Sequence, residues 1–162
     1  HGGEVTVDSE EGFGTEFNVA LPLEPLRQAA IPAAARLGEA PRRGRVLVVD
    51  DEEPVARIAQ RALTAAGMEV TVALDGHTAV SHCHDRLFDA ILLDLNMPRP
   101  DGTETLARLR AAAPRTPVMI VSGRLGAGEI AEAAGVEFLG KPYVYTDLVA
   151  RVSALIEAHT LA

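Results

Sequence analysis

Short apolar runs alternate with amphipathic stretches along most of the chain, from Arg45 onward. The five apolar runs are Val46–Val49, Val70–Ala73, Ala90–Leu93, Val118–Val121 and Val136–Leu139. Unbroken apolar runs of this length are typical of strands that are buried on both faces, as in a parallel sheet. The stretches between them carry apolar residues at helical spacing. The pattern therefore predicts five β-α units that right-handed crossovers wind into an α/β fold.

Capping and breaking residues mark the ends of the predicted helices. Asp75 and Asp101, each followed by a glycine, are placed to cap the second and third helices. Pro114 is expected to end the third helix, and Gly135 the fourth. The last helix has one apolar face, made of Leu148, Val149, Val152, Leu155 and Ile156.

Residues 1–23 follow a different pattern. Apolar and polar residues alternate in two short segments around Gly12 and Gly14, and the apolar positions are Val5, Val7, Phe17, Val19 and Leu21. This alternation predicts a β-hairpin. An isolated hairpin is marginally stable in water, so we expect its partner strands to lie outside this chain.

Residues 24–44 are rich in alanine, proline and arginine and lack a sustained apolar face. The prolines prevent a long helix, so this segment is predicted to be a linker. The expected organisation is a hairpin over 1–23, a linker over 24–44 and an α/β domain over 45–160.

Composition narrows the class of protein. The formal net charge of −8 over 162 residues argues against a general nucleic-acid or membrane surface. The single cysteine, Cys83, excludes an internal disulfide and fits a reducing compartment. No apolar run is long enough to cross a membrane, so a cytoplasmic location is expected. The opening His1-Gly2-Gly3 indicates that the sequence begins inside a longer protein.

Reactive side chains follow four of the five predicted strands. Asp50 and Asp51 follow the first, Asp94 the third, Ser122 the fourth, and Lys141 the fifth. Because the carboxyl ends of parallel strands form the ligand-binding edge of such a sheet, we expect these groups to converge. Crowded carboxylates favour a bound cation, and Mg²⁺ prefers hard oxygen ligands. A carboxylate beside Mg²⁺ can attack phosphorus, and the lysine and serine would hold the transferred group.

Each of these residues also has a purely structural interpretation. Asp50 and Asp51 could cap a helix, Ser122 could belong to a turn, and Lys141 could be a solvated loop residue. Asp94 is harder to explain in this way, since it directly follows a buried apolar run where an uncompensated charge is costly. The joint occurrence of these groups favours phosphoryl chemistry.

Residues 45–158 resemble the receiver domain of bacterial response regulators. The matching segments are Val46–Glu52, Asp94–Pro98 with Asp101 and Gly102, Val121–Gly123, and Lys141–Tyr143. The resemblance implies a flavodoxin-like fold, doubly wound, with a five-stranded parallel sheet in the order 2-1-3-4-5. It also implies that a phosphohistidine donates a phosphoryl group to this domain.

The resemblance assigns a metal site. Asp94 would be the phosphoacceptor and a ligand of Mg²⁺. Asp51 would bind the metal directly, Asp50 chiefly through water, and Asn96 through its backbone carbonyl.

The resemblance also assigns a switch. Lys141 would contact the phosphoryl oxygens, and its bond to Pro142 would be cis. Ser122 would move toward the phosphoryl group, and Phe138 would be the aromatic residue whose inward turn reports phosphorylation. The interval from Ser122 to Lys141 is short for the family, so the fourth helix, 126–134, is expected to be short and its output surface altered.

The first segment is similar to the closing hairpin of a histidine-kinase ATP-binding domain. The resemblance rests on His1–Ser9, Gly12–Phe17 and Leu21-Pro22. It would place Thr15 near the adenine. The Asn- and Gly-rich segments of that nucleotide site are missing here, so this chain is expected to bind no ATP and to have no kinase activity of its own.

These observations predict the C-terminal part of a hybrid sensor histidine kinase, whose upstream segments could anchor it in a membrane. Its partner would be a phosphohistidine on the kinase or on a histidine phosphotransfer domain. Two alternatives stay open: a receiver-like interaction module that is never phosphorylated, and a regulator not joined to a kinase. A phosphatase with an aspartate nucleophile would need a second acid at Asn96, and a dinucleotide-binding domain would need glycines where Asp50–Pro54 stand.

The segment His82-Cys83-His84 has the composition of a metal site but not its spacing. Neighbours one and two apart on a helix do not face each other. Cys83 falls on the apolar side with Ala79 and Val80, so we interpret it as a core residue.

Overall fold

The computed structural model describes residues 4–10, 14–20, 44–98 and 100–160. The chain divides into two compact units, His1–Glu39 and Ala40–Ala162. The predicted linker, 24–44, lies outside the described residues except for Gly44. In the part of the chain that is described, no helix is long and apolar enough to cross a membrane.

The first unit contains an antiparallel hairpin of β1 (Glu4–Glu10) and β2 (Gly14–Ala20). Val7 pairs with Phe17 across the two strands. Both side chains are exposed, at 52% and 67% of their surface. Two apolar side chains left in water on one small hairpin indicate a surface that another element can cover.

The second unit is a five-stranded parallel sheet with the order β4-β3-β5-β6-β7. The strands are β3 (Arg45–Val49), β4 (Glu69–Ala73), β5 (Ala90–Leu93), β6 (Val118–Ser122) and β7 (Glu137–Gly140). The helices are α1 (Glu53–Ala65), α2 (Gly76–Asp85), α3 (Gly102–Ala112), α4 (Ala127–Ala134) and α5 (Tyr145–Thr160). The predicted doubly wound fold and its strand order are confirmed.

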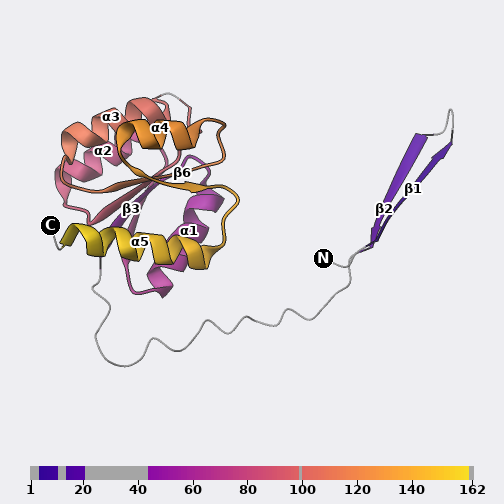
Figure 1. The fold of residues 1–162 in the computed structure, drawn as a ribbon, viewed down its shortest axis with the longest axis horizontal. Coiled ribbons are helices and arrows are strands. Elements are labelled where there is room, and N and C mark those ends of the chain that lie inside the picture. The colour runs from indigo at the N-terminus through magenta and orange to yellow at the C-terminus, as the bar shows by residue number, and fades with distance from the viewer. Residues whose placement is uncertain (1–3, 11–13, 21–43, 99, 161–162) are drawn as a thin grey trace. The chain divides into compact units, whose positions relative to one another are not determined.

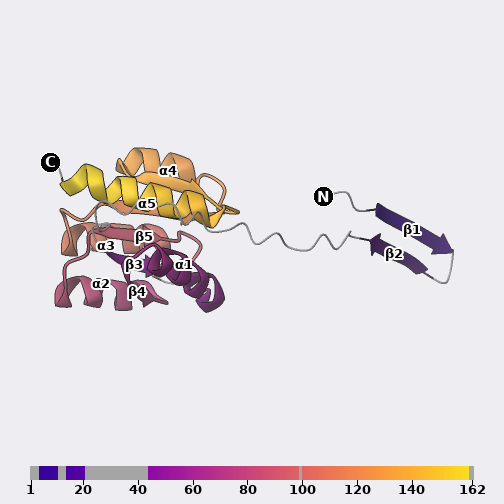
Figure 2. The same cartoon turned by 90° about the horizontal axis from the view of Figure 1, so that it is seen from below.

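Two apolar cores lie on opposite faces of this sheet. Figure 1 shows α2, α3 and α4 over one face and α1 and α5 over the other. In Figure 2, β5, β3 and β4 follow one another across the sheet. The inner strands β3, β5 and β6 are almost wholly buried, whereas the edge strands β4 and β7 are half-exposed. An edge strand has a neighbour on one side only, which is why its residues stay nearer to water.

The predicted last strand begins one residue too early. Val136 does not start β7, because its amide donates to the Ala131 carbonyl at 2.9 Å and closes the end of α4. Gly135, as predicted, ends that helix in the left-handed region, with φ of 62°. The helix is short, and Gly126 precedes it without a side-chain cap.

Both predicted aspartate caps are present. Asp101 accepts a hydrogen bond from the Glu104 amide at 2.8 Å at the start of α3. At the start of α2, the Thr78 amide and hydroxyl donate to the Asp75 carboxylate at 2.8 and 2.7 Å. These hydrogen bonds, of which the one from the Thr78 amide has the largest effect, hold the pKa of the Asp75 carboxyl below its usual value.

The lowered pKa makes the contribution of Asp75 to stability dependent on pH. An ionised carboxylate with a lowered folded-state pKa stabilises above its unfolded pKa, and this stabilisation is lost as the pH falls through the folded value. Asp75→Ala is expected to lower the free energy of unfolding by about 1 kcal/mol at neutral pH, and by less in strong acid. Urea unfolding at both pH values measures the difference. Asp85→Ala, at the other end of α2, should be neutral or slightly stabilising, and an equal loss there would contradict the cap assignment.

Candidate functional site at the carboxyl edge of the sheet

The predicted reactive residues lie at one edge of the sheet because parallel strands all end there. Asp50 follows β3, Asp94 follows β5, Ser122 ends β6 and Lys141 follows β7. Backbone hydrogen bonds continue just beyond the strands, from the Asp94 amide to Val49 O at 2.9 Å and from the Lys141 amide to Ser122 O at 3.1 Å. Each functional residue is thus held by the strand beside it.

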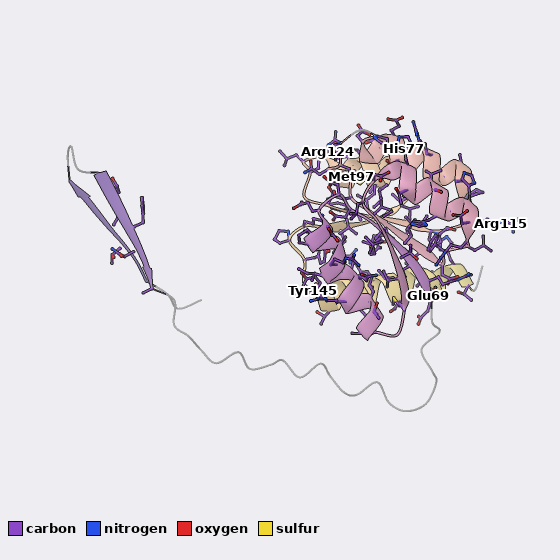
Figure 3. All side chains as sticks on the ribbon, turned by 180° about the vertical axis from the view of Figure 1, so that it is seen from behind. Glu69, His77, Met97, Arg115, Arg124 and Tyr145 are labelled. Carbon is purple, nitrogen blue, oxygen red and sulfur yellow. The ribbon has the colours of Figure 1, made fainter. Side chains whose placement is uncertain are left out.

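Figure 3 marks the two edges of the sheet. Met97, Arg124 and Tyr145 belong to the segments that follow β5, β6 and β7, and they lie on one side of the unit. Arg115 precedes β6 and Glu69 begins β4, and both lie on the other side. The carboxyl and amino edges are therefore separated by the whole length of the strands.

Asp94 is the most enclosed acid of the site, with 4% of its surface exposed. Its Oδ1 accepts hydrogen bonds from the Asn96 amide and from the Ser122 hydroxyl, both at 2.8 Å. Its Oδ2 accepts one from Lys141 Nζ at 2.6 Å. Burial alone would raise the pKa of this carboxyl, but the bonds from Lys141, the Asn96 amide and Ser122 hold the pKa below its usual value. Asp94 is therefore a charged carboxylate at neutral pH.

Lys141 joins two of the strand ends through its ammonium group. Its Nζ lies 2.7 Å from Asp50 Oδ2 and 2.6 Å from Asp94 Oδ2. Burial would lower the pKa of the ammonium, but the hydrogen bonds to Asp50 and Asp94 keep it above its usual value. Asp50 is also buried, and its Oδ1 accepts the Glu52 amide at 2.9 Å. The bond from Lys141 to Pro142 is cis.

Asp51 is placed differently from the other two acids. It is half-buried, and its carboxylate accepts no hydrogen bond from the residues that the structure describes. Among those residues, no three acidic, histidine or cysteine side chains converge as a ready ligand set. Two of the carboxylates, those of Asp50 and Asp94, are instead bridged by the Lys141 ammonium. The donor chemistry nevertheless suits a hard cation, since two carboxylates share one ammonium and a third, that of Asp51, follows the same strand as Asp50.

Phe138 lies at the centre of β7 and is half-buried against the core under α4. A Cβ atom placed on Gly128 of α4 would lie 3.6 Å from its ring, so this glycine leaves room beside the aromatic side chain. Arg151 of α5 donates to the Phe138 carbonyl at 3.1 Å. The predicted switch residue is thus held between α4 and α5.

The sequence pattern predicts no role for two neighbours of the site, Gly102 and Tyr143. Gly102 begins α3 so close to β5 that an added Cβ would lie 2.6 Å from the Asp94 carbonyl oxygen. Tyr143 packs against the core under α1 and α5, and burial raises the pKa of its hydroxyl. Both residues belong to the segments that resemble the receiver family, and this was the only sign in the sequence that they lie near the site. Their contacts could not be predicted, because they depend on the packing of distant elements.

Cys83 lies in the core with Ala79, as predicted. The residue is 7% exposed, and burial raises the pKa of its thiol, so a reactive thiolate is not favoured there.

Known proteins similar to this chain share the α/β unit. A family model described as the response regulator receiver domain matches residues 46–153. The transcriptional regulatory protein PrrA of Mycobacterium tuberculosis is 41% identical over 115 residues, which are 69% of this chain and 49% of that protein. The response regulator MprA of Mycolicibacterium vanbaalenii is 34% identical over 119 residues, or 72% of this chain and 52% of that protein. The chain therefore spans about half the length of these relatives.

Solved structures agree with this match. The receiver domain of the Francisella response regulator 1452 aligns with a TM-score of 0.65 and 30% identity, over 71% of this chain and 98% of that one. A CheY-like receiver domain from Methanospirillum hungatei shares the fold, with a TM-score of 0.68 and 23% identity. The alignment covers 72% of this chain and 96% of that one. The chain belongs to the response regulator receiver domain family of two-component signalling.

Proposed function

We propose that this receiver domain accepts a phosphoryl group from a phosphohistidine onto Asp94 in a Mg²⁺-dependent reaction. The observation that carries the proposal is the state of Asp94 itself. It is a buried, ionised carboxylate with an ammonium, a hydroxyl and a backbone amide around it. A stable core would not need such a charge at this position, whereas a nucleophile does.

The transfer can be written with the groups at hand. An Asp94 oxygen attacks phosphorus, the new O–P bond forms as the N–P bond breaks, and the electron pair returns to the imidazole nitrogen. Lys141 can turn from Asp94 toward a phosphoryl oxygen and keep its bond to Asp50. The Ser122 hydroxyl can leave Asp94 Oδ1 and donate to a second phosphoryl oxygen. Both groups already stand within hydrogen-bond distance of the nucleophile.

The same edge supplies ligands for a divalent cation. We propose that Asp51 binds Mg²⁺ directly, Asp50 through water, Asp94 directly and Asn96 through its carbonyl. When bound, Mg²⁺ neutralises charge on the carboxylates and on the phosphoryl oxygens. Asp51 suits the leading role because its carboxylate is not already engaged within the described part of the chain.

Removal of the Asp51 carboxylate should therefore weaken Mg²⁺ binding. Asp51→Ala is expected to lower the affinity by roughly tenfold or more, as is usual when the ligand shell of a metal is disturbed. Isothermal titration calorimetry measures this directly. Asp85→Ala removes the same charge from the exposed end of α2 and should leave the affinity unchanged. Equal affinities of the parent and Asp51→Ala would contradict the proposed ligand.

Phosphorylation is proposed to be read out through Ser122 and Phe138. The Ser122 hydroxyl already points at Asp94, so phosphorylation would only pass it to a phosphoryl oxygen, and Phe138 would turn inward beside α4 in response. Such a change is a local rearrangement driven by new charge-assisted hydrogen bonds. The short α4 makes the resulting surface different from that of a receiver with a longer helix.

Phosphoryl acceptance is tested with a small donor. Incubation with acetyl phosphate and Mg²⁺ should add one hydroxylamine-labile phosphoryl group per chain, as measured by intact mass spectrometry. EDTA should prevent the addition. Absence of labelling with both acetyl phosphate and a phosphorylated histidine kinase would favour the alternative, an interaction module that is not phosphorylated.

We propose further that the receiver, 45–160, follows a linker, 24–44, and the closing hairpin of a kinase ATP-binding domain, 1–23. The exposed pair Val7 and Phe17 supports this, because it needs a covering surface. The relatives PrrA and MprA are named as regulators, which favours the alternative of a regulator not joined to a kinase.

Footprinting separates these two arrangements. In the full-length protein, hydroxyl radicals should modify Phe17 several-fold less than in the present chain, since burial in a kinase domain removes it from water. Tyr145 of the receiver, which is 44% exposed, serves as the internal control. Equal modification of Phe17 in both proteins would contradict the kinase arrangement.

A further inference from the structure

A pocket of about 530 Å³ lies at the amino edge of the sheet, away from the phosphorylation site. It is formed by the end of α3, the starts of β6 and β7, and the last turns of α5. Pockets that hold small molecules have volumes of roughly 300–1,000 Å³. We propose that this pocket binds a small organic anion with an apolar body.

The floor of the pocket is apolar. Val118 and Leu155 line it with 2% and 9% of their surfaces exposed, and Val136 adds a half-buried side chain. These residues come from β6, from α5 and from the turn before β7, so three different elements hold the floor. An apolar ligand group placed here would leave water without disturbing a buried polar group.

The rim of the pocket is cationic. Arg110, Arg151 and His159 line it, together with a single acid, Glu137. The Arg151 guanidinium lies 3.9 Å from the Glu137 carboxylate, so these two charges offset each other. Arg110 donates only to the Ala134 carbonyl, at 3.3 Å, and among the described residues no carboxylate lies within 4.0 Å of it. One guanidinium charge is therefore left without a counter-ion beside an apolar floor.

This local charge is opposite to that of the molecule. The chain has a formal net charge of −8, so an unneutralised arginine in a concave site marks where an anion is favoured. A guanidinium offers planar, paired donors that match a carboxylate or a phosphate. The combination of floor and rim selects an amphipathic anion over a bare inorganic ion or an uncharged lipid.

The site is also connected to β7. Arg151 lines the pocket and donates to the carbonyl of Phe138, the proposed switch residue. An anion that engages Arg151 therefore contacts a residue that holds this strand. Binding itself can be measured without any phosphorylation, so its test is independent of the proposed function.

The fluorescent aromatic sulfonate 8-anilinonaphthalene-1-sulfonate is the first probe, since it has an anionic group on an apolar body. Saturable binding of one probe per chain is expected. Arg110→Gln should weaken binding roughly tenfold, which is the loss of one hydrogen bond to a charged group. Ala154→Phe, which fills the pocket from an exposed position of α5, should abolish binding of the probe. Arg61→Gln, which removes the same charge from exposed α1, is the matched control and should have no effect.

Decanoate and decanol then separate charge from apolarity. Decanoate should displace the probe, and decanol should do so at least roughly tenfold less well. In a ¹H–¹⁵N correlation spectrum, decanoate should shift the amide signals of Val118, Val136 and Phe138. The proposal is overturned if binding is not saturable, if Arg110→Gln and Ala154→Phe both bind the probe like the parent, or if decanol competes equally. One probe bound per two chains, with dimeric sedimentation, would likewise overturn it in favour of an interface between copies.

Discussion

Asp94→Asn is expected to abolish phosphoryl transfer to this chain. An amide oxygen is a poor nucleophile, so the rate should fall by roughly a thousandfold or more, as when other enzyme nucleophiles are removed. The variant should still fold. The amide oxygen can accept the hydrogen bonds from the Asn96 amide and the Ser122 hydroxyl, and Lys141 retains its hydrogen bond to Asp50. The rate of phosphorylation is obtained by incubating the protein with acetyl phosphate and following the hydroxylamine-labile phosphoryl group over time by mass spectrometry.

Asp85→Asn is the matched control, because Asp85 is an exposed aspartate at the end of α2. Asp85→Asn should be phosphorylated at the same rate as the parent. Circular dichroism should show that both variants are folded. If Asp94→Asn is labelled at the parental rate, the phosphoryl group goes elsewhere and the assignment of Asp94 is wrong.

Gly102→Ala is expected to destabilise the receiver domain and to slow phosphorylation together. The added methyl would lie 2.6 Å from the Asp94 carbonyl oxygen and still closer to the backbone of Leu95. Backbone atoms cannot turn away as a side chain can, so α3 or the loop after β5 must shift. Overpacking of this kind costs typically about 1–3 kcal/mol. Since the loop also carries Asn96, the shift would disturb the amide that binds Asp94.

Gly128→Ala is the matched control, a glycine-to-alanine change inside α4. Its methyl would meet the Phe138 ring at 3.6 Å, an ordinary contact. It should leave the stability unchanged or raise it by about 0.5–1 kcal/mol, because alanine favours the helix. Urea unfolding of both variants measures the difference. Equal stabilities of Gly102→Ala and the parent would show that α3 can move away freely.

The two variants test different aspects of the site. Asp94→Asn removes the nucleophilic carboxylate and keeps its surroundings. Gly102→Ala keeps the carboxylate and displaces the loop whose Asn96 amide binds it. A rate that falls in both cases, with stability reduced only in the second, separates chemistry from positioning.

Local pattern was enough to predict most of the elements and the edge of the sheet that carries the chemistry. Buried strands need unbroken apolar runs, and β5 coincides with its predicted range, Ala90–Leu93. Helix starts need an acceptor for free amides, and Asp75 and Asp101 supply it through bonds that span three residues. Strands that run parallel end on one side, so Asp50, Asp94, Ser122 and Lys141 had to converge.

The tertiary structure alone decided how those residues meet. In sequence Asp50 and Asp51 are adjacent and alike, yet the first is buried against Lys141 and the second keeps its carboxylate unengaged within the described residues. Lys141 reaches Asp50 and Asp94 across 91 and 47 residues, which depends on the strand order. The start of β7, the close approach of Gly102 and the pocket beside Arg110 likewise depend on packing between distant elements. Local patterns reflect how each segment meets water, whereas contacts of this kind depend on three-dimensional neighbours that no short segment specifies.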